Sequence, residues 1–123
     1  MTPSEVVSAL IDACQARDLD AACALVTDDV VYDNVPIGVV HGPDGVRSVL
    51  SGGVMQAATE VEWVTHRQVA DGSTVMNERT DRFLVDGRWV EIPIAAVFEV
   101  RDGRVALWRD YFDLETYRKQ SSS

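Results

Sequence analysis

The amino-terminal part of the chain has apolar residues at helical spacing. It opens with a strong helix start, in which Thr2 is the N-cap, proline takes the first helical position and Glu5 closes a capping box. An apolar stripe over residues 6–14 then predicts that the helix continues to about Arg17.

Two shorter helices and one strand are predicted next. The first short helix begins at Asp18 or Asp20, either of which can serve as its N-cap. A strand follows over residues 30–35 and ends at the proline and glycine that come after it. A third helix opens at Gly42 and is stopped by the glycine pair Gly52-Gly53.

From residue 58 onward, apolar and polar residues alternate, which is typical of strands. Three Asp-Gly pairs separate the alternating segments, at Asp71-Gly72, Asp86-Gly87 and Asp102-Gly103. Asp-Gly favours tight hairpin turns because these turns need positive φ. Four strands joined by three such turns predict an antiparallel meander, with Pro93 at a bulge or a position outside the hydrogen-bond ladder.

Helices followed by a run of strands indicate the α+β class. We expect a long, curved sheet folded over the amino-terminal helices, which makes a cone whose hollow holds a ligand. The chain, residues 1–123, is expected to be one domain, because its length suits a single domain with a real core.

Composition narrows the classes of partner. Hydrophobic content of 46% and charged content of 25% are ordinary for a soluble globular protein. The formal net charge of −9 argues against nucleic acid or an anionic membrane surface, because both require a basic patch. No apolar run approaches the roughly 20 residues of a membrane span.

The cysteines and histidines give no sign of disulfides or metals. Cys14 and Cys23 lie among apolar neighbours in predicted helices, so we expect buried free thiols. The amino terminus lacks the features of an export signal, which agrees with a reducing, cytoplasmic location. His41 and His66 are far apart and lack metal-ligand spacing, so no structural metal is expected.

Two predicted strands place charged residues in rows of apolar side chains. Over residues 75–83, alternation puts Arg79 and Asp81 on one face with apolar neighbours. Over residues 106–112, it puts Asp110 on the same face as two aromatic side chains. Because an ordinary half-buried strand keeps charge off its apolar face, this pattern indicates a small catalytic pocket.

Tyr32 and Asn34 add a hydroxyl and an amide, which fall on the inward face of their strand. One guanidinium, that of Arg79, has enough donors to bridge Asp81 and Asp110. Two carboxylates that share a positive charge suit proton transfer, because their pKa values can be split between an acid and a base. The simplest chemistry for this set is addition of water with protonation of a leaving oxygen. Most Arg-x-Asp pairs on strands are instead surface salt bridges.

Three segments resemble signatures of the limonene-1,2-epoxide hydrolase family. They are Tyr32-Asp33-Asn34, Asn77-Glu78-Arg79-Thr80-Asp81 and Trp108-Arg109-Asp110-Tyr111-Phe112-Asp113-Leu114. They resemble its Tyr-x-Asn, Glu-Arg-x-Asp and Trp-Arg-Asp-Tyr-Phe-Asp-Leu motifs, in the same order and across most of the chain. The resemblance implies the cone-shaped, cystatin-like α+β fold, with a mixed, mainly antiparallel sheet, that nuclear transport factor 2, ketosteroid isomerases and SnoaL-like polyketide cyclases share.

The resemblance also implies a function, a one-step hydrolysis of a small apolar epoxide to a vicinal diol. Asp110 would be the general base, Tyr32 and Asn34 would hold the attacking water, Asp81 would be the general acid, and Arg79 would bridge the two acids. The family works without cofactor, metal or covalent intermediate, and is usually a homodimer through the outer face of the sheet.

Apolar side chains on the same faces are candidates for the walls of a substrate pocket, since pockets are mostly apolar. They are Trp63, Phe83, Ile92, Ile94 and Phe112. Trp108 and Phe98 are predicted to serve packing alone.

Two other functions remain open at this point. One is an isomerase or polyketide-cyclase-type enzyme, which would use one acid as a base on a carbon acid. The other is a non-catalytic small-molecule binder on the same fold. Fold alone does not choose among them. The presence of Arg79 with both acids favours the hydrolase, because abstraction of a proton from carbon needs only one base and an oxyanion donor.

Overall fold

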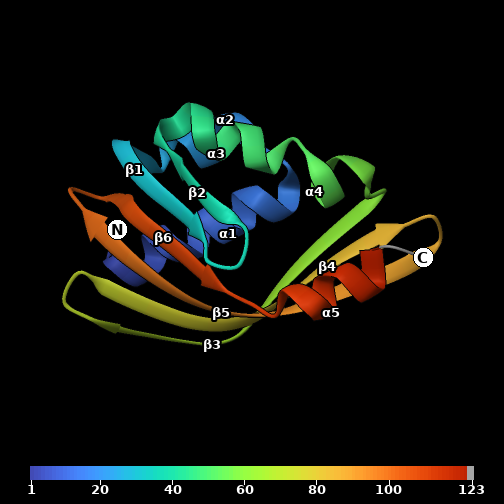
Figure 1. Cartoon of the computed structure of the whole chain (residues 1–123). Coiled ribbons are helices and arrows are strands. Elements are labelled where there is room, and N and C mark those ends of the chain that lie inside the picture. Colours follow the sequence, from blue (N-terminus) through green and yellow to red (C-terminus); the bar gives the residue numbers. More distant parts are fainter. Residues whose placement is uncertain (122–123) are drawn as a thin grey trace.

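The computed structural model describes residues 1–121 and is organised around a six-stranded sheet (Figure 1). The helices are α1 (Pro3–Ala16), α2 (Leu19–Ala24), α3 (Gly42–Leu50), α4 (Gly53–Ala57) and α5 (Leu114–Ser121). The strands are β1 (Val26–Asn34), β2 (Gly38–His41), β3 (Glu60–Asp71), β4 (Thr74–Val85), β5 (Arg88–Arg101) and β6 (Arg104–Tyr111). Their order in the sheet is β2-β1-β6-β5-β4-β3, and only β1 and β6 pair in parallel.

The sheet is strongly curved, and α1 to α4 lie on its concave side (Figure 1). Helix α1 begins as predicted, because the Thr2 hydroxyl accepts from the Glu5 amide and the Glu5 carboxylate accepts from the Thr2 amide. Its apolar stripe packs on the concave face, where the core is fully buried at Leu10, Phe98 and Trp108. The expected α+β class with a curved, mainly antiparallel mixed sheet is confirmed.

The predicted meander is also confirmed, since β3 to β6 are consecutive antiparallel neighbours. Two of the three hairpins have Asp-Gly as the two turn residues, both at positive φ: 51° and 77° at Asp86-Gly87, and 53° and 76° at Asp102-Gly103. The third turn differs. Asp71 still pairs with Thr74, so the turn residues are Gly72-Ser73, and of these two only Gly72 has positive φ.

Pro93 lies where one side of β5 has no neighbouring strand. The last pair between β5 and β6 is Ala95 with Tyr111, so Pro93 lies beyond the end of β6. A proline lacks the amide hydrogen that a second ladder would need, and this position therefore tolerates it.

Two short elements were not predicted, and one predicted strand begins earlier than expected. Strand β2, at Gly38–His41, was not predicted because the proline and glycine before it were interpreted as the end of the strand region. Helix α4, at Gly53–Ala57, was missed because Gly52-Gly53 was interpreted only as a helix stop. Strand β1 begins at Val26, before the predicted start, because backbone pairing of Val26 with Val105 overrides its polar local sequence.

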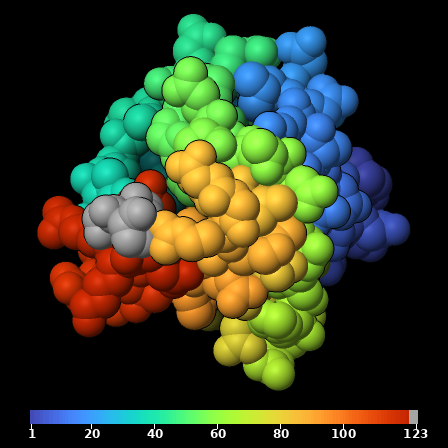
Figure 2. Space-filling model, turned by 90° about the vertical axis from the view of Figure 1, so that its right-hand side faces the viewer, coloured from blue at the N-terminus to red at the C-terminus, as the bar shows by residue number. Residues whose placement is uncertain are grey.

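Helix α5 docks on the part of β5 that β6 leaves unpaired. The Gln120 side-chain amide accepts from the Glu91 backbone amide at 2.7 Å and donates to the Glu91 carbonyl at 2.7 Å, as a neighbouring strand would. Figure 2 views the molecule from the side where α4, the turn between β4 and β5, and α5 lie close to one another. Side chains from α4 and α5 line the pocket described below.

Two sequence expectations concern the described residues as a whole. Cys14 in α1 is buried and Cys23 in α2 is half-buried, and both are free thiols. No helix among residues 1–121 is both long enough and apolar enough to span a membrane.

Candidate active site

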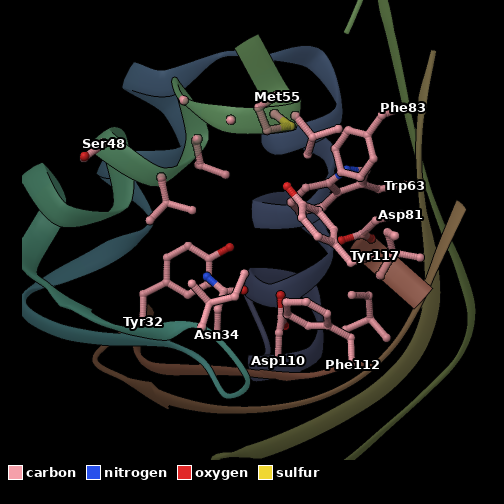
Figure 3. Close-up of a pocket in the computed structure, with 18 residues that line it drawn as sticks. Tyr32, Asn34, Ser48, Met55, Trp63, Asp81, Phe83, Asp110, Phe112 and Tyr117 are labelled. Atoms are coloured by element: carbon pink, nitrogen blue, oxygen red, sulfur yellow. The ribbon is translucent and has the colours of Figure 1, made fainter. Parts of the chain in front are cut away.

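A cavity of about 340 Å³ lies between the concave face of the sheet and helices α3, α4 and α5 (Figure 3). Its volume falls within the range of small-molecule sites, which is roughly 300–1,000 Å³. Polar side chains line its floor at the sheet: Tyr32, Asn34, Asp81 and Asp110. The other walls are mostly apolar, so the cavity is polar at its floor and apolar elsewhere.

All five predicted wall residues line this cavity: Trp63, Phe83, Ile92, Ile94 and Phe112. The sequence prediction missed the helical side of the pocket, to which Val49 and Leu50 of α3 and Val54 and Met55 of α4 contribute. The apolar stripe of α3 could have pointed to the first two. Helix α4 itself was not predicted, so the other two had no usable signal.

At the polar end, the structure brings the three charged residues together as an ion-pair bridge. The Arg79 side chain is fully buried. Its Nε donates to Asp81 Oδ1 at 2.8 Å and its Nη2 donates to Asp81 Oδ2 at 3.2 Å. The same Nη2 donates to Asp110 Oδ2 at 2.7 Å, so one guanidinium joins both carboxylates.

The sheet register explains why this bridge can form. Arg79 lies on β4 and Asp110 on β6, with β5 between them, so the side chain must cross a distance of roughly two strand spacings of about 4.8 Å each. In the register, Asn77 pairs with Ala96 and Ala96 pairs with Asp110. The methyl group of Ala96 is the side chain that β5 places in this row, and it leaves room for the guanidinium.

Tyr32 and Asn34 reach Asp110 from the other side, through the parallel pair of β1 and β6. In that pair Tyr32 is opposite Trp108 and Asn34 is opposite Asp110. The Tyr32 ring stacks on Trp108 with centroids 3.9 Å apart and an interplanar angle of 12°. Burial raises the pKa of the Tyr32 hydroxyl well above its usual value, so this group remains a protonated donor at neutral pH.

Two residues of the site were not predicted as functional. Trp108 was expected to serve packing alone, and this is wrong, because its Nε1 donates to Asp110 Oδ1 at 2.9 Å. The two-residue spacing on one strand face was the signal that could have shown this contact. Asn77, on the same face as Arg79, accepts from Arg79 Nη1 at 3.4 Å.

Burial and the contacts among Asp81, Asp110 and Arg79 shift the pKa values of Asp81 and Arg79. Burial raises the pKa of Asp81 to about 6, and the opposing effect of the Arg79 guanidinium only partly offsets it. Burial alone would lower the pKa of Arg79, but the carboxylates of Asp110 and Asp81 outweigh it and hold that pKa above its usual value. A contact with a guanidinium by itself lowers the pKa of a carboxyl. Asp81 has that contact, and its pKa is raised by burial all the same.

Comparison with known proteins gives the chain a family. Residues 1–122 match the family model described as the limonene-1,2-epoxide hydrolase catalytic domain. The chain is also 41% identical over 108 residues to "Epoxide hydrolase EphG" of Mycobacterium tuberculosis, which covers 88% of this chain and 71% of that protein. The chain belongs to the limonene-1,2-epoxide hydrolase family. It is therefore assigned as an epoxide hydrolase of this family.

Solved structures agree with the family and with the fold. A structure described as an LEH-like epoxide hydrolase of M. tuberculosis superposes with a TM-score of 0.83 at 37% identity, over 98% of this chain and 89% of that one. An NTF2-like protein from Burkholderia pseudomallei superposes with a TM-score of 0.85 at 21% identity, over 100% of both chains. The second likeness shows the fold alone, and it confirms the predicted fold family for this limonene-1,2-epoxide hydrolase family member.

No group of three His, Cys, Asp or Glu side chains within residues 1–121 is arranged to hold a metal ion. The charged side chains that line the pocket of this family member are those of Asp81 and Asp110, and Arg79 bridges them.

The register predicts that Ala96→Val will impair catalysis by this family member. Two added methyl carbons between Asn77 and Asp110 would crowd the path of the Arg79 side chain, and overpacking of this kind costs about 1–3 kcal/mol. We expect kcat to fall roughly tenfold or more, which corresponds to about 1.4 kcal/mol. The change in kcat is measured from initial rates of epoxide hydrolysis by the folded variant and the wild type.

The control is Ala95→Val on the same strand, because Ala95 is exposed on the opposite face. Ala95→Val should leave kcat within about twofold of the wild type. Equal kcat for Ala96→Val and the wild type would contradict the role assigned to the small side chain.

Proposed function

We propose that this chain hydrolyses a small apolar epoxide to a vicinal diol in one step, by general acid and base catalysis without a cofactor. The observation that carries the proposal is the pair of buried carboxylates, Asp81 and Asp110, joined by the Arg79 guanidinium at the polar end of an apolar pocket. Family membership supports the reaction class, and the geometry supports the division of roles.

In this mechanism Asp110 is the general base. The attacking water is held by the Tyr32 hydroxyl and the Asn34 amide, which line the pocket beside Asp110. Trp108 and Arg79 each donate to a different oxygen of Asp110, which fixes the orientation of the carboxylate. As water loses its proton to Asp110, its oxygen forms a bond with one epoxide carbon.

Asp81 is the general acid. The carbon–oxygen bond of the epoxide breaks as Asp81 gives its proton to the departing oxygen, which becomes the second hydroxyl of the diol. Its pKa of about 6 keeps a useful fraction of Asp81 protonated near neutral pH. After the reaction Asp110 holds a proton and Asp81 lacks one, so a proton must pass from the first to the second before the next turnover.

The pocket walls support an apolar substrate. We propose that Trp63, Phe83, Ile92, Ile94 and Phe112 bind its hydrocarbon part, since all five line the cavity. An isomerase or cyclase on this fold would need one base and an oxyanion donor. The two acids and their shared arginine favour hydrolysis instead.

One prediction of this mechanism concerns the source of the new oxygen. In oxygen-18 water, a single turnover with limonene oxide or another small epoxide should place label in the diol, because water attacks carbon directly. In Asp110→Asn, turnover should fall by at least about 100-fold, since the general base is lost. Mass spectrometry of the diol measures both.

The matched control is Asp33→Asn. Asp33 lies beside Asn34 but turns to the other face of β1, where it accepts from Arg109 Nε at 3.0 Å. It should retain near wild-type turnover. Unlabelled diol from the first turnover would mean that a carboxylate attacks carbon, and the one-step mechanism would then be wrong. If the wild type turns over no epoxide and the Asp110→Asn variant still binds it, the chain would instead be a non-catalytic small-molecule binder.

The pH dependence gives a second prediction. A general acid must be protonated to act, and Asp81 loses its proton as pH rises through about 6. Activity should therefore fall as pH rises, with an alkaline limb in kcat/KM near that pH, and Asp81→Asn should remove most of the activity. Initial rates between roughly pH 4 and pH 9 test this. A profile that stays flat through this range would contradict the assignment of Asp81.

We also propose that the chain forms a homodimer through the convex face of the sheet. Met76 and its β3 partner Val69 are exposed there, at 49% and 65%. Sedimentation should give the mass of two chains, and Met76→Lys should shift it toward one. The control Val39→Lys changes an equally exposed residue at the far edge of the sheet and should leave the mass unchanged. One-chain mass for the wild type would refute this proposal.

A further inference from the structure

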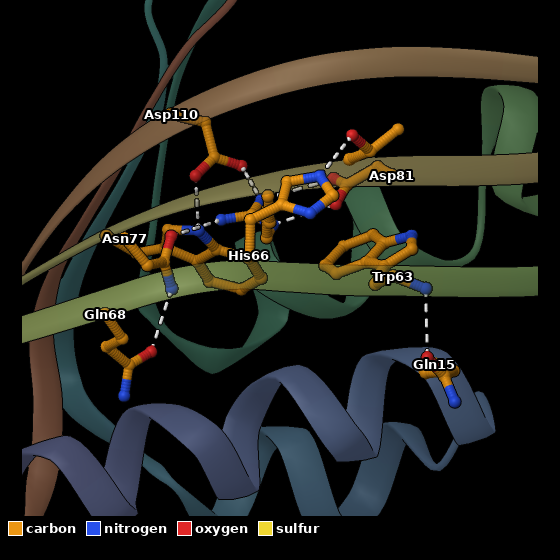
Figure 4. A network of polar contacts seen from close by, with 10 residues as sticks. Gln15, Trp63, His66, Gln68, Asn77, Asp81 and Asp110 are labelled. Carbon is orange, nitrogen blue, oxygen red and sulfur yellow. Dashed lines mark hydrogen bonds and ion pairs between the residues drawn. The ribbon is translucent and has the colours of Figure 1, made fainter.

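A chain of hydrogen bonds leads from Arg79 through Asn77 to Gln68 (Figure 4), and continues from Gln68 to helix α1. Arg79 Nη1 donates to Asn77 Oδ1 at 3.4 Å, and Asn77 Nδ2 donates to Gln68 Oε1 at 3.1 Å. Gln68 Nε2 then donates to the Ser4 carbonyl oxygen at 3.0 Å and to the Ser4 hydroxyl at 2.8 Å, in the first turn of α1. The chain thus links β4, the edge strand β3 and α1.

The two ends of this chain fix its direction. A guanidinium can only donate, so the atom of Asn77 that faces Arg79 must be its oxygen. A backbone carbonyl can only accept, so the atom of Gln68 that faces Ser4 must be its nitrogen. Each amide therefore has one orientation that satisfies both neighbours, and flipping either one would place like groups against each other.

We propose that Asn77, supported from behind by Gln68, is a positioning residue for epoxide hydrolysis, which it serves by holding the Arg79 guanidinium in its bridging position. This inference rests on the proposed function. Arg79 uses Nε and Nη2 for the two acids, and Nη1 is the part of the guanidinium that Asn77 holds. Asn77 is 6% exposed and sits directly behind the ion-pair bridge on the same strand face.

Position 77 requires a hydrogen-bond acceptor that carries no charge. With both acids ionised, the cluster of Asp81, Asp110 and Arg79 carries one net negative charge. An aspartate at position 77 would add a second negative charge and would compete with the other two acids for the same cation. An amide satisfies Arg79 Nη1 without that competition, so the guanidinium stays shared between the acid and the base.

Other titratable groups also face this cluster. The groups whose charges act within it are Arg79 and Asp81 on β4, Asp110 on β6, Tyr32 on β1 and Cys14 on α1. Burial raises the pKa of both the Cys14 thiol and the Tyr32 hydroxyl, so both are neutral across the working pH range. The charge that a variant at position 77 would perturb is therefore that of the bridge.

The test compares kcat, KM and the pH profile of folded variants. Asn77→Ala should lower kcat roughly tenfold and leave KM within about twofold, because the pocket walls are untouched while the bridge loosens. Gln68→Ala should lower kcat by a smaller factor, of about threefold, because Asn77 keeps its contact with Arg79. Asn77→Asp should shift the alkaline limb assigned to Asp81 to higher pH by at least about half a unit, because of the added negative charge.

Gln15→Ala is the matched control. Gln15 Oε1 accepts from the Trp63 backbone amide at 2.9 Å, so it also ties α1 to β3, but it holds the Trp63 backbone and not a side chain that is hydrogen-bonded to Arg79. The Trp63 ring itself lies beside the guanidinium, with Arg79 Cζ 5.1 Å from its centroid. It should lower stability about as much as Gln68→Ala does, with kcat and the alkaline limb unchanged. If Gln15→Ala lowers kcat as much as Gln68→Ala, or if Asn77→Ala keeps wild-type kcat, the positioning role is wrong.

A carboxyl-carbon NMR titration of Asp81 separates this inference from the proposed function. If the wild type forms no diol, the proposed function fails, and the titration still reports on the bridge. The upward shift of the Asp81 titration in Asn77→Asp, with no shift in Gln15→Ala, supports the coupling through Arg79. An Asp81 titration that is the same in all three proteins overturns it.

Discussion

The structure depends on one buried interaction, the Arg79 guanidinium shared between Asp81 and Asp110. Three charged groups are taken out of water here, which is costly unless each is paired and hydrogen-bonded. The geometry meets that condition, since both carboxylates accept from Arg79 and Asp110 also accepts from Trp108. Removing Arg79 would leave both carboxylates without a counter-charge in an apolar interior.

The rest of the sheet is arranged so that this bridge can exist. Strands β4, β5 and β6 must hold a register that puts Asn77, Ala96 and Asp110 in one row, and the middle side chain must be small. Strand β1 adds Asn34 to the same row by pairing in parallel with β6. A slip of one residue in any of these pairs would turn the polar side chains to the convex face.

The polar floor and part of the apolar walls of the site come from different layers of the fold, so the charged groups of the sheet lie under apolar helices. The sheet supplies every acid and the arginine, whereas α3, α4 and α5 contribute to the walls over them. Enclosure raises the pKa of Asp81 to about 6 even though a cation touches it. In the proposed mechanism the same apolar walls would bind the substrate and keep the general acid protonated, so binding and catalysis would share one physical cause.

Much of this protein was determined by local sequence. The capping box at Thr2, the turns at Asp86-Gly87 and Asp102-Gly103, and the strand alternation that turns Arg79 inward all follow from short-range sterics and periodicity, and the structure has them as predicted. Alternation also identified the inward-facing residues of the site, because the period of a strand is fixed whatever its neighbours are.

The contacts between side chains, and the pairing of distant segments, were decided only by the tertiary structure. Alternation shows that Trp108 faces inward but not that its indole donates to Asp110, and it could not show that Asn77 and Gln68 join Arg79 to α1. Strand β2 and helix α4 are too short for a periodic signal, and the parallel pairing of β1 with β6 joins segments far apart in the chain. Such contacts depend on register and on burial, which come from the packing of the entire sheet rather than from any one segment.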